Sequence, residues 1–250
     1  MKEIAIEDII QLFKESGVDE IINDYPSAFQ KRKPKLAIIQ TSAPLAAISK
    51  AEDDSLRIAK QCNDLTSLYE AVLNFDGCPL KATANKTVFS DGSENADVMI
   101  IGEAPGANED IEGIPFCGQS GKLLDQIFDS VDLVRSRNLY IANAIFWRPP
   151  GNRKPTAKEL AICRPFVEKH ISLIKPKLIV ACGSSALASL LPDLTTPITK
   201  LRGKMLDYDN QFLTDKIKLI PIFHPSFLLR QPSRKKSAWE DMITIKNFIN

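Results

Sequence analysis

The sequence has no long apolar run, only two histidines and almost no net charge, and each shortage narrows the possible functions. Its 250 residues contain no stretch near the roughly 18 apolar residues that a membrane span needs. The acidic start, residues 1–7, resembles neither a signal peptide nor a transit peptide. We therefore expect a cytoplasmic protein with no membrane partner.

The five cysteines are odd in number, and none of them has the Cys-x-x-Cys spacing. Neither a disulfide framework nor a zinc knuckle is indicated, and reduced thiols are expected. The Gly-Lys-Ser/Thr element of a phosphate loop is also missing, since Lys122 is followed by leucine. That absence weakens one alternative, a nucleotide-binding regulatory module.

The net charge of +1 hides an uneven distribution along the chain. Residues 1–25 hold seven acids against two bases, whereas residues 148–177 hold eight bases against two acids. Residues 200–250 hold ten bases against five acids. The two basic segments are able to form one positive face for phosphate contact, although solvated helix faces explain the same charges.

Three segments with different patterns divide the chain. Apolar residues at helical spacing predict an N-terminal amphipathic helix within residues 1–25. Residues 26–55, rich in Pro, Ser, Ala and Lys, have the composition of a linker. Residues 56–250 are expected to form the folded domain.

Within that domain, apolar runs that suit strands alternate with segments of helical spacing. The runs are residues 97–102, 139–145, 177–182 and 217–223, and Thr156 with Glu159 forms a capping box before the longest helical segment. This alternation predicts an α/β protein, a three-layer α/β/α sandwich around a mostly parallel four-stranded sheet. In such sheets the ligand site lies at the carboxyl ends of the strands.

A glycine-rich loop, Gly102 to Gly121, follows the first of these strands and leads into a helix. Glycines allow a ligand to approach the backbone closely. Phe116 is a candidate platform for a flat ring, with an ordinary core phenylalanine as the alternative. Glu103 and Glu109 are able to orient water or stabilise a sugar cation, although exposed loop carboxylates are common.

Two polar residues follow other strands of the predicted sheet. Asn143 offers both a donor and an acceptor, which match the O4 and N3–H edge of uracil, although asparagine is also common in turns. His224 precedes a Pro-Ser turn, where a neutral imidazole is able to stabilise a leaving anion. The other histidine, His170, lies within a helical segment among apolar residues.

The segment after His224 places leucines before a basic cluster. Leu228 or Leu229 is a candidate for insertion into a base stack, while Arg230, Arg234, Lys235 and Lys236 hold phosphates. A second cationic loop runs from Arg148 to Lys154. An ordinary basic loop is the alternative in both cases.

Together and in this order, these segments resemble the type-4 group of the uracil-DNA glycosylase superfamily. The resemblance covers residues 68–248 and rests on the motifs at residues 102–121, 143–153 and 224–230. It implies a monofunctional enzyme that flips uracil out of single- or double-stranded DNA and hydrolyses the N-glycosidic bond. It implies no membrane partner, and we expect a monomer.

The resemblance also assigns roles to individual residues. Glu103, Glu109 and His224 would be catalytic, and the residues that contact or support uracil would be Ala104, Phe116, Asn143 and Asn152. DNA would be held by Arg148, Arg153, Leu228, Leu229, Arg230, Arg234 and Lys235. The aspartate that activates water in other members has no counterpart, because Ala104 stands at its position.

The sequence departs from the type-4 pattern in its cysteines. Type-4 enzymes hold a [4Fe-4S] cluster on four cysteines, but only Cys78 and Cys163 match those positions. Phe75 and Trp147 stand at the other two, so we predict that aromatic packing replaces the cluster and that no metal is bound. The main functional alternative is a protein that binds or covalently traps damaged DNA with little turnover.

Overall fold

The computed structural model describes residues 45–249, with the backbone alone for residues 45–49. The predicted helix of residues 1–25 lies outside this range, as does the predicted linker up to residue 44. Helix α2 (Leu45–Gln61) begins within the range predicted as linker, and its Ala59 is fully buried. The prediction is corrected there, because residues 45–55 belong to a helix that packs on the domain.

The described chain alternates helices and strands. The strands are β1 (Ser90–Gly92), β2 (Val98–Gly102), β3 (Leu139–Asn143), β4 (Leu178–Cys182), β5 (Leu206–Tyr208) and β6 (Ile217–Ile222). The remaining α-helices are α3 (Leu65–Asn74), α4 (Ala107–Glu112), α5 (Gln119–Asp129), α6 (Ala157–Ile174), α7 (Ser184–Leu190), α8 (Ile198–Leu201), α9 (Pro225–Arg230) and α10 (Lys235–Ile249). Short 3-10 turns are η1 (Pro79–Thr83), η2 (Pro150–Asn152) and η3 (Pro232–Arg234).

The six strands form one sheet in the order β1-β3-β2-β4-β6-β5. The four inner strands are parallel and are the four that the sequence predicted. β1 and β5 add antiparallel edge strands, for which the sequence carries no clear signal. The mostly parallel α/β class is confirmed, with six strands in place of four.

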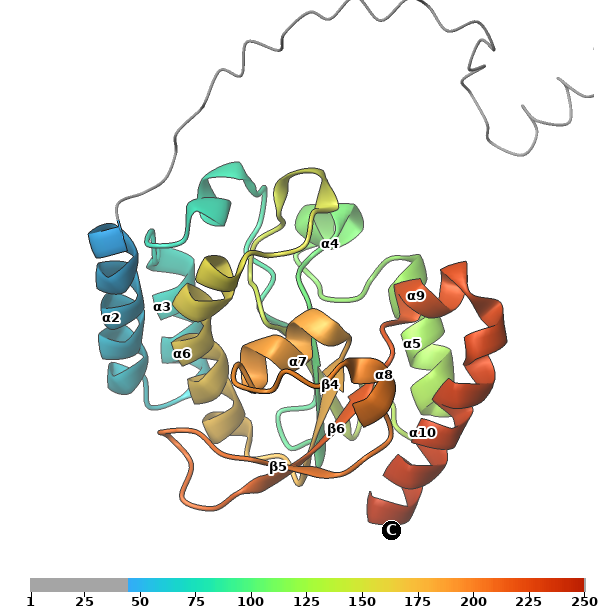
Figure 1. The fold of residues 1–250 in the computed structure, drawn as a ribbon. Coiled ribbons are helices and arrows are strands. Elements are labelled where there is room, and N and C mark those ends of the chain that lie inside the picture. The colour runs from blue at the N-terminus through green and yellow to red at the C-terminus, as the bar shows by residue number, and fades with distance from the viewer. Residues whose placement is uncertain (1–44, 250) are drawn as a thin grey trace, which may run out of the picture. The chain divides into compact units, whose positions relative to one another are not determined.

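Alternate residues of each inner strand enter separate cores on the two faces of the sheet. In β2, Met99 and Ile101 pack with α2, α3, α6 and α7, whereas Val98 and Ile100 pack with α5 and α10. All four side chains are fully buried. Figure 1 shows these two groups of helices on opposite sides of the sheet, which confirms the three-layer sandwich.

The caps of individual helices follow from their sequences. Glu159 N donates to the Thr156 hydroxyl at 3.2 Å, and the Glu159 carboxylate accepts from Thr156 N at 2.7 Å. This is the predicted capping box, and it starts α6. No helix in residues 45–249 is long and apolar enough to cross a membrane.

Candidate active site

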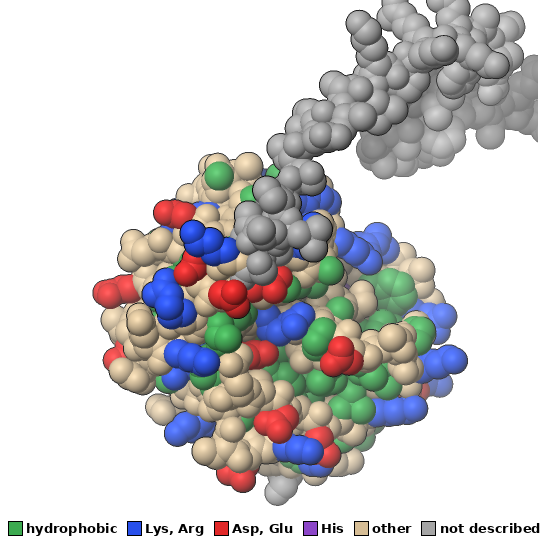
Figure 2. Space-filling model, turned by 60° about the vertical axis from the view of Figure 1, so that its left-hand side comes forward, with side chains coloured by type: hydrophobic (Ala, Val, Ile, Leu, Met, Phe, Trp, Pro, Cys, Tyr) green, Lys and Arg blue, Asp and Glu red, His purple; other side chains and the backbone are tan. Residues whose placement is uncertain are grey.

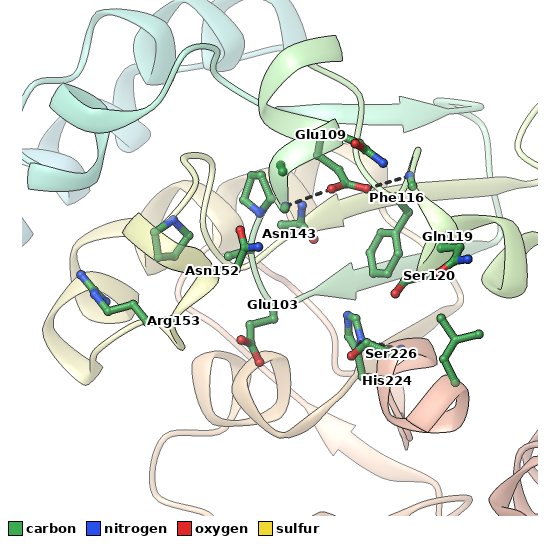
Figure 3. A pocket seen from close by; sticks show the side chains of 18 of the residues that line it. Glu103, Glu109, Phe116, Gln119, Ser120, Asn143, Asn152, Arg153, His224 and Ser226 are labelled. Atoms are coloured by element: carbon green, nitrogen blue, oxygen red, sulfur yellow. Dashed lines mark hydrogen bonds between the residues drawn. The ribbon is translucent and has the colours of Figure 1, made fainter. Parts of the chain in front are cut away.

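A cleft of about 440 Å³ lies at the carboxyl ends of the parallel strands. Its walls come from segments far apart in the sequence: the loop after β2, the end of β3, the turn η2 and the start of α9 (Figure 3). Predicted site residues that line it are Glu103, Ala104, Glu109, Phe116, Asn143, Asn152, Arg153, His224, Leu229 and Arg230. A cleft of this size accepts a small molecule or a nucleobase.

The floor of the cleft depends on Gly102, the last residue of β2. A Cβ at this position would collide with Asn143 Oδ1 and with the Phe116 ring. Asn143 is 2% exposed, and it lines the cleft. The missing Cβ therefore lets the Phe116 ring and the Asn143 amide meet at one point of the cleft wall.

Phe116 is fixed through its backbone. Its φ of 52° is in the left-handed region, which is uncommon for a residue other than glycine. The Arg135 guanidinium donates to Phe116 O and to Pro115 O, both at 2.7 Å. Because Arg135 also bonds Asp91 at 2.9 Å and Asp125 at 2.8 Å, it holds the Phe116 segment against β1 and α5.

Replacement of Arg135 with lysine is expected to loosen the Phe116 segment, because an ammonium cannot reproduce the four bonds of the guanidinium fork. A misplaced ring is expected to lower kcat/KM about 10-fold or more, since small displacements at a site are costly. The free energy of unfolding should also fall, by about 2 kcal/mol, and thermal unfolding measures this loss. Arg137→Lys is the control, because Arg137 bonds Asp132 O and contacts neither Phe116 nor Pro115. Equal kcat/KM in Arg135→Lys and Arg137→Lys would contradict this role.

The two predicted carboxylates have different surroundings. Glu109 Oε2 accepts from Gly106 N at 3.0 Å, and its Oε1 accepts from Gly118 N at 2.9 Å. Glu109 therefore joins the start of α4 to the start of α5. Glu103 lines the cleft without a side-chain hydrogen bond to any described residue, so its carboxylate is the one available to water (Figure 3).

His224 is the N-cap of α9. Its Nδ1 accepts the backbone N–H of Ser226 at 3.2 Å and lies 2.8 Å from Ser226 Oγ. Burial and the nearby Arg230 lower the pKa of His224 to about 4, against an opposing effect of Glu109. The ring is therefore neutral near pH 7, and because Nδ1 is an acceptor, Nε2 carries the hydrogen.

The imidazole faces Phe116 across the cleft. The two ring centroids are 5.5 Å apart and the planes are inclined by 31°. Residues from the first turns of three helices, Asn108 of α4, Ser120 of α5 and Ser226 of α9, also line the cleft. Helix starts present free N–H groups and the positive end of the helix dipole, so this site favours developing negative charge.

Both arginines of the predicted cationic loop, Arg148 and Arg153, form hydrogen bonds within the protein. Arg153 donates to Glu159 at 2.9 and 2.6 Å, and its side chain points away from the cleft in Figure 3. Arg148 Nε donates to Asn152 Oδ1 at 2.8 Å. Asn152 thereby has a supporting contact at the rim of the cleft, whereas Arg153 braces the start of α6.

The two leucines after His224 lie in different environments. Leu228 is 1% exposed and packs with Phe223 and Ala238, so the prediction that it inserts into a base stack is corrected. Leu229 is 39% exposed and lines the cleft beside Arg230. Of the two, Leu229 is the residue that is able to contact a ligand. Arg234, the last residue of η3, and Lys235, the first residue of α10, are both exposed.

The predicted cluster position is filled by side chains. Cys78 and Cys163 are buried, and their mutual hydrogen bond together with burial raises the pKa of Cys163 well above that of an ordinary thiol. Phe75 packs edge-on against Phe166 at 5.0 Å, and Trp147 donates to Thr87 Oγ1 at 3.0 Å. Four thiolates are required for a [4Fe-4S] cluster, and two of the four positions hold buried aromatic rings, so these residues do not fit one.

Across residues 45–249, no group of three or more His, Cys, Asp or Glu side chains is arranged to hold a metal ion. The sequence also left several residues of the site unidentified. Ser226 orients His224, Arg135 holds Phe116, and Gly102 makes room for Asn143. The His-Pro-Ser sequence was a signal for Ser226, but Arg135 lies 19 residues from Phe116 and has no local signal.

Comparisons with known proteins show which proteins this chain is similar to. A family model of the uracil DNA glycosylase superfamily matches residues 89–243. A type-4 uracil-DNA glycosylase of Thermotoga maritima is 37% identical over 182 residues, which are 72% of this chain and 92% of that protein. Type-4 enzymes of Sulfurisphaera tokodaii and Pyrobaculum aerophilum are each 34% identical, over 74% and 72% of this chain and 84% and 91% of their own lengths.

Proposed function

The chain belongs to the uracil-DNA glycosylase superfamily and excises uracil in DNA repair, and we propose that it does so by flipping uracil into the cleft and hydrolysing the N-glycosidic bond. One observation carries this mechanism: Phe116, Asn143 and His224 come from three separate segments of the chain and line the same cleft. Phe116 suits the flat ring of a base, Asn143 suits its polar edge, and His224 suits the anion that forms as the base leaves.

Uracil is recognised by its shape and its polar edge. The Phe116 ring stacks on the base, in a position set by Arg135 and Gly102. The Asn143 amide accepts from uracil N3–H and donates to O4. Cytosine carries an acceptor at N3 and a donor at N4, so a fixed amide opposes it.

His224 stabilises the leaving base. As the C1′–N1 bond breaks, its electron pair passes to uracil and negative charge develops on N1 and O2. The neutral imidazole donates its Nε2–H to O2, and the helix starts around the cleft favour the same charge. Because the Nε2 atom carries a hydrogen, it lacks the free lone pair that covalent trapping of the sugar would need.

Water completes the reaction at C1′. Glu103 is the carboxylate available to hold this water and to face the positive charge that develops on the sugar. The water oxygen forms the new bond to C1′ as uracil departs, and one water proton is released. Ala104 stands beside Glu103 without a carboxylate of its own, so electrostatic stabilisation of the leaving base carries much of the rate.

DNA lies across the mouth of the cleft. Leu229 fills the space left in the base stack, and Arg230 contacts a phosphate beside it. We propose a monomer acting on single- or double-stranded DNA. The cysteines of the described residues are all free thiols, which is typical of a reducing compartment such as the cytoplasm.

The proposed function is tested on a uracil-containing oligonucleotide with a labelled end. The expected products are free uracil and an abasic strand, which breaks only after alkaline treatment. A heat-stable protein–DNA adduct without released uracil would support the trapping alternative. Strand cleavage without alkali would contradict a monofunctional enzyme.

We propose that this chain works without an iron–sulfur cluster, and its purified form is expected to contain neither iron nor acid-labile sulfide. The support is the pair of buried rings, Phe75 and Trp147, at two of the four ligand positions. The matched comparison is the double variant Phe75→Cys, Trp147→Cys, which restores four thiols. Iron and sulfide analysis after identical reconstitution distinguishes the two proteins, and iron bound stoichiometrically to the wild type would contradict the proposal.

The rate of uracil release is expected to stay nearly constant from pH 8 down to about pH 5, because the pKa of His224 is lowered to about 4. Below that pH, protonation of Nδ1 removes the acceptor for Ser226 N–H and the rate falls. In the unfolded chain the pKa of a histidine is near 6.5, so the unfolded state takes up a proton before the folded state does. The folded protein therefore loses stability as the pH falls from about 6.5 to about 4. Single-turnover rates measured with parallel thermal unfolding check this, and an acid limb near pH 6.5 in folded protein would contradict it.

A further inference from the structure

Trp239, on the second turn of α10, is 53% exposed, whereas Trp147 is 1% exposed. Large aromatic side chains normally bury most of their surface, and exposed ones are typical of binding sites. The mechanism proposed above gives Trp239 no role.

The indole borders a small apolar slot of about 90 Å³ between two helices. Leu123 and Ile127 of α5 form one side, and Ala238, Trp239 and Met242 of α10 form the other. Lys235 stands at the same slot, one helical turn before Trp239. An apolar surface with one cation beside it suits a flat ring that is attached to a phosphate.

The slot is joined to the cleft through one buried cluster. Leu228 and Ala238 belong to this cluster, and Leu123 and Ile127 pack against it. Leu229, the next residue after Leu228, lines the cleft. Helices α5 and α9 contact each other, and turn η3 contacts both α9 and α10. The slot therefore lies next to the helix that carries Leu229 and Arg230.

The connecting segment has one sign of charge. Every side chain from residue 229 to residue 236 is exposed, and the segment contains Arg230, Arg234, Lys235 and Lys236 with no acid. By contrast, the face in Figure 2 carries Lys and Arg side chains interspersed with Asp and Glu. From Arg230 at the cleft to Lys236, shortly before Trp239, the chain is therefore basic and exposed, which suits contact with phosphates.

We propose that Trp239 and its slot bind an unpaired nucleobase of the same DNA strand, flanking the flipped uracil, while Lys235 and Lys236 contact its phosphates. This inference rests on the proposed function, since it extends that DNA path. Stacking on an indole accepts any base, so the site adds affinity for single strands without sequence preference. Charge complementarity favours DNA over an apolar protein surface here, because the basic residues lie at the Trp239 end of α10, whereas the exposed Phe248 lies at the other end.

The first test is the binding of a uracil-free, fluorescein-labelled oligo(dT) strand, which needs no catalysis. Trp239→Ala is expected to weaken binding about five-fold or more, and Trp239→Phe to recover part of the loss. Ile243→Ala is the matched control, since Ile243 is 45% exposed one turn farther along α10. Equal affinities of wild type and Trp239→Ala, or an equal loss in Ile243→Ala, would overturn the proposal. Retained affinity with concentration-dependent self-association abolished by Trp239→Ala would overturn it in favour of a protein partner.

The second test uses fluorescence and separates the two proposals. Oligo(dT) is expected to quench the emission of Trp239 in the wild type, with no quenching in Trp239→Phe, because Trp147 is buried. In excision assays, wild type is expected to prefer a long single strand over a very short uracil-containing oligonucleotide, through KM, and Trp239→Ala to lose that preference. Absence of uracil release from every substrate would contradict the proposed function, while the quenching result would still decide the Trp239 site.

Discussion

Replacement of His224 with alanine is expected to slow uracil release about 100- to 1,000-fold, the usual effect of losing one donor to a developing anion. The wild-type imidazole is neutral because burial and Arg230 lower its pKa to about 4, and Ser226 N–H fixes the tautomer. Its Nε2–H is thus ready to donate before the bond breaks. Single-turnover rates at saturating enzyme isolate this step, and the affinity for substrate should change little.

The role of His224 as the N-cap of α9 requires a control. Alanine removes the cap as well as the donor, at a cost of about 1 kcal/mol in stability. His224→Asn keeps a side chain that caps helices well, but its amide is shorter than an imidazole. If catalysis depends on the donor, the asparagine variant should regain stability in thermal unfolding while its rate stays low. If His224→Asn recovered both the rate and the stability, the slow rate of His224→Ala would be due to the lost helix cap and not to the lost donor.

The sequence predicts the centre of the fold well because its signals there are local. Each inner strand is a short apolar run, and the Thr156–Glu159 box starts α6 within four residues. Edge strands β1 and β5 have three residues each and carry no such run, so they were missed. The start of α2 was missed because polar residues interrupt its apolar pattern, and contacts with α6 stabilise it.

Some residues of the candidate site could likewise be predicted from local sequence signals, whereas the roles of others depend on packing. Phe116, Asn143 and His224 follow predicted strands or loops, so their shared edge was predictable. Leu228 and Leu229 are adjacent in sequence, and only packing distinguishes the buried one from the exposed one. Glu109 and Arg153 carry charged groups that are typical of functional residues. In the folded protein, however, the Glu109 carboxylate accepts hydrogen bonds from two backbone N–H groups, and Arg153 donates to Glu159.

The replacement of cluster ligands by rings has a physical consequence for the fold. In this chain, Phe75, Trp147, Cys78 and Cys163 all belong to the core that also contains α3 and α6. Burial of two large rings contributes apolar stabilisation where a cluster would contribute metal–sulfur bonds. On the proposal that no cluster is bound, this packing holds the Phe75 region to the domain, and none of the four residues lines the cleft.

Replacement of Asn143 with aspartate is expected to lower kcat/KM for uracil about 1,000-fold or more at pH 7. The side chain is 2% exposed and packs closely on Gly102, where an added Cβ would collide with Asn143 Oδ1. A carboxylate still accepts from N3–H, but it has no donor for O4, and two acceptors then oppose each other. Sites that pair with polar groups of their substrate reject mismatches strongly, because buried groups remain unpaired.

Asn143→Ala is the matched control for this repulsion, since alanine removes both hydrogen bonds without adding charge. The aspartate variant should be slower than the alanine variant at pH 7, and it should recover in acid, because a protonated carboxyl regains a donor for O4. The wild-type rate should stay nearly constant down to about pH 5, since the pKa of His224 is lowered to about 4. A carboxylate also accepts from the cytosine amino group, so the preference for uracil over cytosine should shrink. An aspartate variant as active as the alanine variant at every pH would show that Asn143 does not read the polar edge of the base.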